Sequence, residues 1–168
     1  MANPNTPKAL AQLIGRLAFV GTRVAGNLVY VNAVDQMLTD IANAQGLTGG
    51  MPVTPCMQVW AGKSAYDPTS ASSYAGSTGV VLLILDLWEQ QSATFDTIWS
   101  RLEDDLQIAI NNIMGNQQLA SNGQSHATAI RSVPVDEYEH KQLIQLGETY
   151  YVYRRAAFSV DVLPFDTP

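Results

Sequence analysis

The chain contains little cysteine, histidine and charge, and each shortage excludes a class of function. Its 168 residues include one cysteine, Cys56, so no disulfide can form within the chain. The two histidines are His126 and His140, and no pair of Cys or His residues has the spacing of a zinc site. Charged residues make up 14% of the chain, against about 25% in ordinary domains. We therefore expect a surface that carries small polar side chains or is buried against other chains.

Long hydrophobic runs and positive charge are also scarce. The longest apolar run, at 80–85, covers only a third of the about 20 residues that a membrane helix needs. Nine Lys and Arg residues against fifteen Asp and Glu residues give a net charge of −6, which argues against binding nucleic acid through its phosphates. Gln12 and Arg16 interrupt the apolar segment 9–21, so no secretory signal is expected. The sequence predicts a soluble product of the cytoplasm.

Motifs for catalysis, metal binding or phosphate binding are missing too. The glycines at 21, 26, 46, 49 and 50 do not have the spacing of a phosphate-binding loop. Glu103, Asp104 and Asp105 would point about 100° apart around a helix and would not converge on one metal ion. The acidic segment 136–140 includes His140 but has no nucleophile near it in the sequence. We expect no enzyme, no metal site and no cofactor.

Two helices can be predicted from the apolar spacing. The clearer one covers Thr94–Met114, where apolar residues recur every three or four positions; Asp96 in its first turn and Gly115 after its last turn suit the two ends. The other begins with Thr6 as cap and Pro7 as first residue, and ends at Gly21. The segment 23–32 allows a strand or a turn, and 34–46 suggests a further helix.

Four segments have the composition of strands: 56–61, 80–89, 127–139 and 148–164. We expect segment 80–89 to be buried on both faces in its first half and on one face at its end. Pro134 predicts an edge or bulged strand. The fold class expected is α+β: one antiparallel sheet of about four strands, with the long helix packed on it and a helical segment at the N-terminus.

The predicted organisation is a single domain over 8–164, between a flexible arm at 1–7 and a tail at 165–168. A loop at 62–79, rich in Ser, Ala, Thr and Gly, is too long for a tight turn. It also holds Tyr66 and Tyr74, which are aromatic residues of the kind that dominate interfaces. We expect an assembly loop that a neighbouring subunit orders; an ordinary mobile surface loop is the alternative.

Candidate binding residues lie in the last predicted strand and in the long helix. Three tyrosines close together indicate a protein interface or a site for stacking on a ligand. The arginine pair beside them cannot make a basic stripe, because consecutive strand residues point to opposite faces. Glu103, Asp104 and Asp105 are predicted to form an acidic face toward solvent, an interface or a lumen, and Cys56 to be a buried structural thiol. The expected interface residues are Tyr66, Tyr74, Tyr150, Tyr151, Tyr153, Arg154 and Arg155.

The order of these segments resembles that of the tail terminator (tail completion) proteins of long-tailed bacteriophages. In that family an N-terminal helix leads to a strand flanked by prolines, here Pro52-Val-Thr-Pro-Cys-Met-Gln-Val-Trp-Ala61. A hydrophobic strand at 80–89 and a long amphipathic helix at 92–114 follow, and two closing strands near 127–139 and 150–163 complete the pattern. The resemblance covers roughly residues 52–164 and is one of order and pattern.

The resemblance implies a hexameric ring of identical subunits on the last ring of the tail tube, where it ends tube growth and offers a surface to the head. The partners implied are the tail tube protein, a neck or head-completion protein and, in a contractile tail, the sheath. DNA would pass the lumen without specific binding, and no membrane is involved. The protein would lie in the tail–neck region of the virion after assembly in the host cytoplasm.

Three alternatives remain open from the sequence. A neck or head-completion connector, or another tail-associated protein, is similar in size and partly in fold. A module that binds a small ligand or peptide through the tyrosines at 150–153 belongs to a different class, as does an enzyme.

Overall fold

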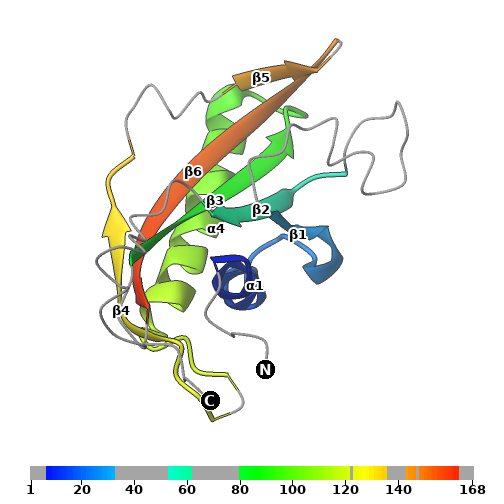
Figure 1. Ribbon diagram of the computed structural model, residues 1–168. Helices are drawn as coiled ribbons and strands as arrows, with labels where there is room; N and C mark the ends of the chain where they lie inside the picture. Colours follow the sequence, from blue (N-terminus) through cyan, green and yellow to red (C-terminus); the bar gives the residue numbers. More distant parts are fainter. Residues whose placement is uncertain are drawn as a thin grey trace.

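The computed structural model describes residues 7–32, 53–61, 80–121, 123–135, 143–146 and 148–162. In these residues it contains two α-helices and a six-stranded sheet of order β1-β2-β3-β6-β4, with β5 paired to β6 (Figure 1). The fold is mixed α/β, as expected in outline. The helices are α1 (Pro7–Ala18) and α4 (Phe95–Met114); the strands are β1 (Val29–Asn32), β2 (Cys56–Ala61), β3 (Val80–Gln90), β4 (Ala127–Val133), β5 (Leu143–Leu146) and β6 (Thr149–Val162).

The sheet corrects the sequence prediction in strand number and direction. The expected four strands are present as β2, β3, β4 and β6, and β1 and β5 are added. Segment 23–32 contains both expected structures, because a 3-10 turn at Gly26–Leu28 leads into β1. The prediction of a purely antiparallel sheet is wrong, since β1 pairs parallel with β2. Direction depends on the connection between two strands, which a four-residue pattern does not reveal.

Several predictions lie outside the described residues. These are the arm at 1–6, the helix at 34–46, the loop at 62–79 with Tyr66 and Tyr74, the last part of the strand predicted at 127–139, and the tail at 165–168.

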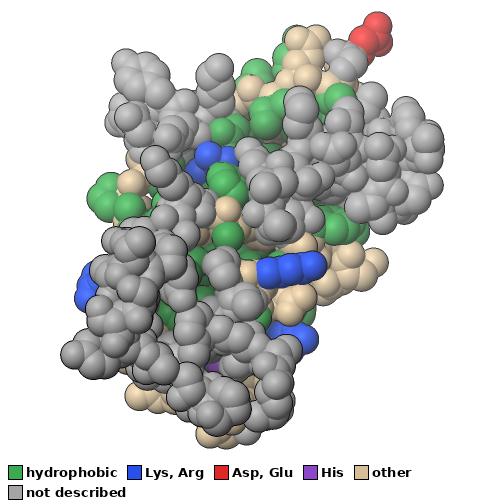
Figure 2. Space-filling model, in the orientation of Figure 1, with side chains coloured by type: hydrophobic (Ala, Val, Ile, Leu, Met, Phe, Trp, Pro, Cys, Tyr) green, Lys and Arg blue, Asp and Glu red, His purple; other side chains and the backbone are tan. Residues whose placement is uncertain are grey.

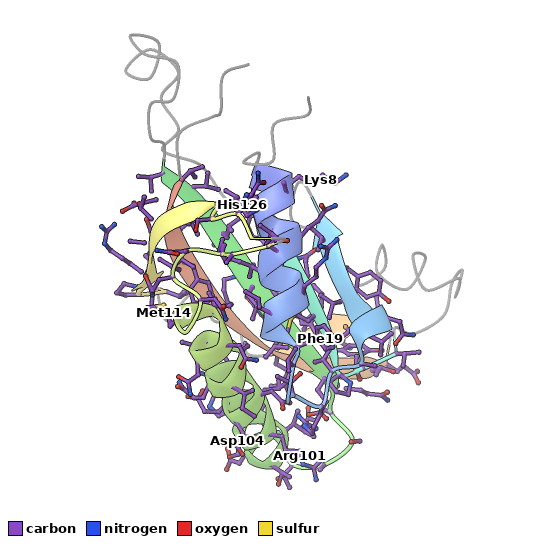
Figure 3. All side chains as sticks on the ribbon, turned by 90° about the horizontal axis from the view of Figure 1, so that it is seen from below. Lys8, Phe19, Arg101, Asp104, Met114 and His126 are labelled. Carbon is purple, nitrogen blue, oxygen red and sulfur yellow. The ribbon has the colours of Figure 1, made fainter. Side chains whose placement is uncertain are left out.

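Both helices pack on one face of the sheet, which we call the helix face (Figure 3). The register alternates the side chains of the central strands between this face and the opposite face. Leu85 of β3 lies between Val59 of β2 and Ala156 of β6, and all three contribute to the core with the helices. Fully buried residues of the helices in this core are Leu10, Ala11, Ile14, Ala18, Ile98, Leu102, Ala109 and Ile113.

The ends of the helices follow the signals expected from the sequence, except for the backbone conformation of Gly115. Thr94 caps α4, and its side chain accepts a bond from the Thr97 amide at 3.4 Å. Gly21 has φ +80° at the end of α1, a conformation that favours glycine. Gly115 ends α4 in the right-handed conformation, with φ −73°. The Asn112 side chain binds the end of α1 to α4, because its amide donates to the carbonyl of Leu17 at 3.1 Å and to that of Val20, just after α1, at 2.7 Å.

The burial of β3 is the reverse of the prediction. Its first half alternates, with Leu82 half-buried between buried neighbours, whereas its second half is buried on both faces up to Glu89. The second half carries two acidic residues, Asp86 and Glu89, which lie on opposite faces of the strand. Both are buried because arginines from other segments bind them.

Candidate functional site

A buried polar cluster lies on the opposite face of the sheet. The register places Gln58, Asp86 and Arg155 side by side on β2, β3 and β6. Arg155 Nε donates to Asp86 Oδ1 at 2.7 Å, and Arg155 Nη2 donates to Oδ2 at 3.2 Å. Trp60 Nε1 donates to the same Oδ2 at 2.9 Å. Asp86 is fully buried, and both of its oxygens are engaged. This carboxylate therefore joins three strands and is not available as a general base.

The predicted tyrosine patch is not formed, because alternate residues point to different faces. Tyr151 and Tyr153 are buried on the opposite face and pack against Cys56 and Trp88. Tyr150 is 42% exposed on the other side of the strand. Only one of the three tyrosines can therefore meet a partner without rearrangement of the subunit.

Cys56 is the buried structural thiol that the sequence predicted. Its side chain is fully buried, and this burial raises the pKa of the thiol to about 12. Burial also raises the pKa of Tyr151, and the nearby Cys56 adds to the effect. The Tyr151 hydroxyl and the Trp88 Nε1 group are buried and have no hydrogen-bond partner among the described residues. This cluster holds no activated nucleophile, since the thiol stays protonated.

Arg154 lies on the helix face, so the two arginines point in opposite directions as predicted. It forms an ion pair with Glu103 of α4, and its guanidinium lies 3.8 Å from the centre of the Trp99 ring. Trp99 in turn stacks on Phe95. Desolvation lowers the pKa of Arg154, and Glu103 opposes this shift. Both arginines expected at an interface are thus used within the subunit.

Asp105 does not belong to the exposed acidic face that the sequence predicted on α4. Asp105 is 3% exposed and accepts bonds from the Nε and backbone amide of Arg23, at 2.9 and 3.2 Å. Arg23 also binds Glu89 of β3, with Nη2 3.1 Å from Oε2. Glu103 pairs with Arg154 while its side chain stays 39% exposed, and Asp104 is exposed. Sequence reasoning missed Arg23, which stands alone in a turn region with no spacing signal.

Among the described residues, three cationic side chains form no ion pair: Lys8, Arg16 and Arg101. Two of these lie on α1, where Lys8, Gln12 and Arg16 follow each other at intervals of four residues along the exposed side. We call these three residues the α1 ridge. In the sequence, this four-residue spacing shows as polar residues on the side of the helix opposite Leu10 and Ile14.

Clefts lie on both sides of the α1 ridge, and both are lined by Gln12 and Arg16. One, of about 300 Å³, has an apolar floor that includes Phe19, Val29 and Val31. The other, of about 250 Å³, reaches Leu13 and His126. The ridge thus combines two cations that pair with no described carboxylate and hollows of mixed polar and apolar lining, which suits a protruding acidic partner.

Among the residues that the structure describes, no three His, Cys, Asp or Glu side chains form a group that could hold a metal ion. In the same residues no helix is long and apolar enough to cross a membrane. The chain matches no protein-family model and no curated protein sequence.

Proposed function

We propose that this chain is a tail terminator of a long-tailed bacteriophage. It forms a hexameric ring on the last ring of the tail tube, stops tube growth and offers the surface that joins the head. It acts by binding and not by catalysis. The observation that carries the proposal is the order and layering of the elements: α1, β2 after its prolines, β3, α4, then β4 and β6, with both helices on one face of the sheet.

The distribution of charge supports an assembly role. Asp86, Glu89 and Asp105 are buried and bound by arginines within the subunit. Among the described residues, the large hydrophobic side chains left exposed are Val20, Val53, Leu143 and Tyr150. Exposed hydrophobic side chains of this kind are suited to contacts with neighbouring copies.

The partners proposed follow from the position of such a ring. One side meets the tail tube protein and the other the neck or head-completion protein, and in a contractile tail the sheath lies outside. The net charge of −6 favours free passage of DNA through the lumen, since like charges repel its phosphates. The place of function is the tail–neck region of the virion.

Native mass spectrometry together with negative-stain imaging of the purified chain tests the proposal. The expected result is a closed multimer, with a mass near six subunits and a central hole. A chain that stays monomeric at every accessible concentration would contradict it.

A further inference from the structure

The hairpin of β5 and β6 projects from the body of the molecule, at the top of Figure 1. Its strands carry two exposed hydrophobic side chains, Leu143 at 44% and Tyr150 at 42%. The register places them as diagonal neighbours, because Leu143 lies opposite Val152 and Gln145 lies opposite Tyr150. Glu148, between the strands, is exposed and has no ion pair with any described residue. Figure 2 shows acidic atoms at this tip.

The α1 ridge has the complementary properties. Lys8 and Arg16 are exposed cations without ion pairs to described residues, and they flank clefts of about 300 and 250 Å³. Val20, just after α1, is 55% exposed. Figure 3 shows α1 lying at the outside of the sheet, from Lys8 to Phe19. One surface is therefore hollow, basic and partly apolar, and the other protrudes and is acidic and apolar.

We propose that the β5–β6 hairpin of one copy docks on the α1 ridge of the next copy. Leu143 and Tyr150 fill the two clefts, and Glu148 pairs with Arg16, which lines both of them. Leu143 and Tyr150, two of the large hydrophobic residues left exposed in the described part of the chain, are then buried in one contact. The inference rests on the proposed function, because it specifies the subunit contact of the ring.

The contact must form between copies. In Figure 1 the hairpin lies at the top of the molecule and α1 in its lower half, so a subunit cannot bring its own two surfaces together. Two different patches that meet make a head-to-tail interface, and repetition of such an interface closes into a ring when the rotation between neighbours permits. A subunit with one hairpin and one α1 ridge has the two ends that such a ring requires.

Charge reversal tests this contact in the full chain. Arg16→Glu and Glu148→Arg should each weaken the multimer about tenfold or more, read from native mass distributions against concentration, because each places like charges opposite one another. The double variant should restore the wild-type mass distribution. Arg101→Glu is the matched control, since it reverses an exposed, unpaired cation on α4 and should leave assembly unchanged. All three substituted positions are exposed, so the melting temperatures of the four variants should stay near the wild-type value.

The outcomes separate the contact from the function. Wild-type multimers whose stability neither single variant changes would overturn the hairpin contact and leave the ring function in place. Single variants that weaken assembly without recovery in the double variant would also overturn the pairing. A wild-type chain that never assembles would contradict both the contact and the proposed function.

Discussion

Arginine and carboxylate side chains connect segments that lie far apart in the sequence. Arg23 reaches both Glu89 of β3 and Asp105 of α4, and Arg155 binds Asp86 across the sheet. The three carboxylates are buried, so removal of an arginine leaves a charge without compensation. At the scale of the residue, the stability of the fold therefore depends on keeping each of these buried carboxylates paired with its arginine.

Arg23→Gln should lower the free energy of unfolding by about 2–3 kcal/mol. Breaking a buried pair costs about 3–5 kcal/mol, and the cost is smaller here because the Arg23 side chain is 38% exposed to solvent. Urea denaturation followed by circular dichroism measures the change. Arg101→Gln is the control and should differ from wild type by less than about 0.5 kcal/mol. Equal stability of the two variants would show that the Arg23 contacts do not stabilise the fold.

The thiol of Cys56 should react slowly in the native protein. With a pKa raised to about 12, only about one thiol in ten thousand is ionised at pH 8, and denaturation should speed labelling by a disulfide reagent by orders of magnitude. Rapid labelling of the native protein would contradict the burial of Cys56.

The same shift makes stability depend on pH. Because burial raises the pKa of Cys56 in the folded chain, the unfolded chain loses the thiol proton at a lower pH. The contribution of Cys56 to the free energy of unfolding is therefore complete below pH 9 and falls as the pH rises from 9 toward 12. Cys56→Ala should flatten this decline in urea denaturation experiments between pH 9 and 10.5. An unchanged slope in the variant would assign the decline to other groups.

Single residues could be predicted where the local pattern decides their environment. The apolar neighbours of Cys56 indicated its burial, and the period of two in a strand separated Arg154 from Arg155. The same period of two places Tyr150 on an exposed side of β6 and Tyr151 on a buried side, so the tyrosines could not form the single patch that was predicted. The burial of Asp105 could not be predicted, because its partner Arg23 is brought there only by the tertiary fold.

At the scale of the element, α4 contributes one side of buried apolar residues to the core. Its buried side faces β3, β4 and β6, and residues such as Leu102 and Ile113 are fully buried there. The long apolar period made this helix predictable from Thr94 to Met114. The short strands β1 and β5 have four residues each, which is too few for a pattern to identify them or their direction.

Leu102→Ala tests the orientation of α4. It should destabilise the fold by about 2–5 kcal/mol through the cavity that it leaves. Gln107→Ala changes an exposed position of the same helix and should cost less than about 0.5 kcal/mol. Thermal or urea unfolding compares the two variants; a similar small loss in both would mean that α4 presents a different side to the sheet.

At the scale of the whole molecule, the balance of charge suits a ring through which DNA passes. Most arginines of the described residues are paired with carboxylates, and the chain as a whole carries −6. Phosphate binding requires unpaired cations gathered on one surface, and the α1 ridge offers only Lys8 and Arg16.

Fluorescence anisotropy with a labelled DNA duplex should therefore show no measurable binding by the purified chain in about 150 mM salt. Micromolar or tighter binding under these conditions would instead favour a neck connector that grips DNA.

The most direct measurement of the central claim is the length of tail tubes assembled in the presence of this chain. Tail tube protein from the same genome is polymerised with and without it, and tubes are measured by electron microscopy. A tail terminator would give short tubes that stop growing, each with extra density of ring shape at one end. Tubes that grow equally long with bare ends would contradict a tail terminator.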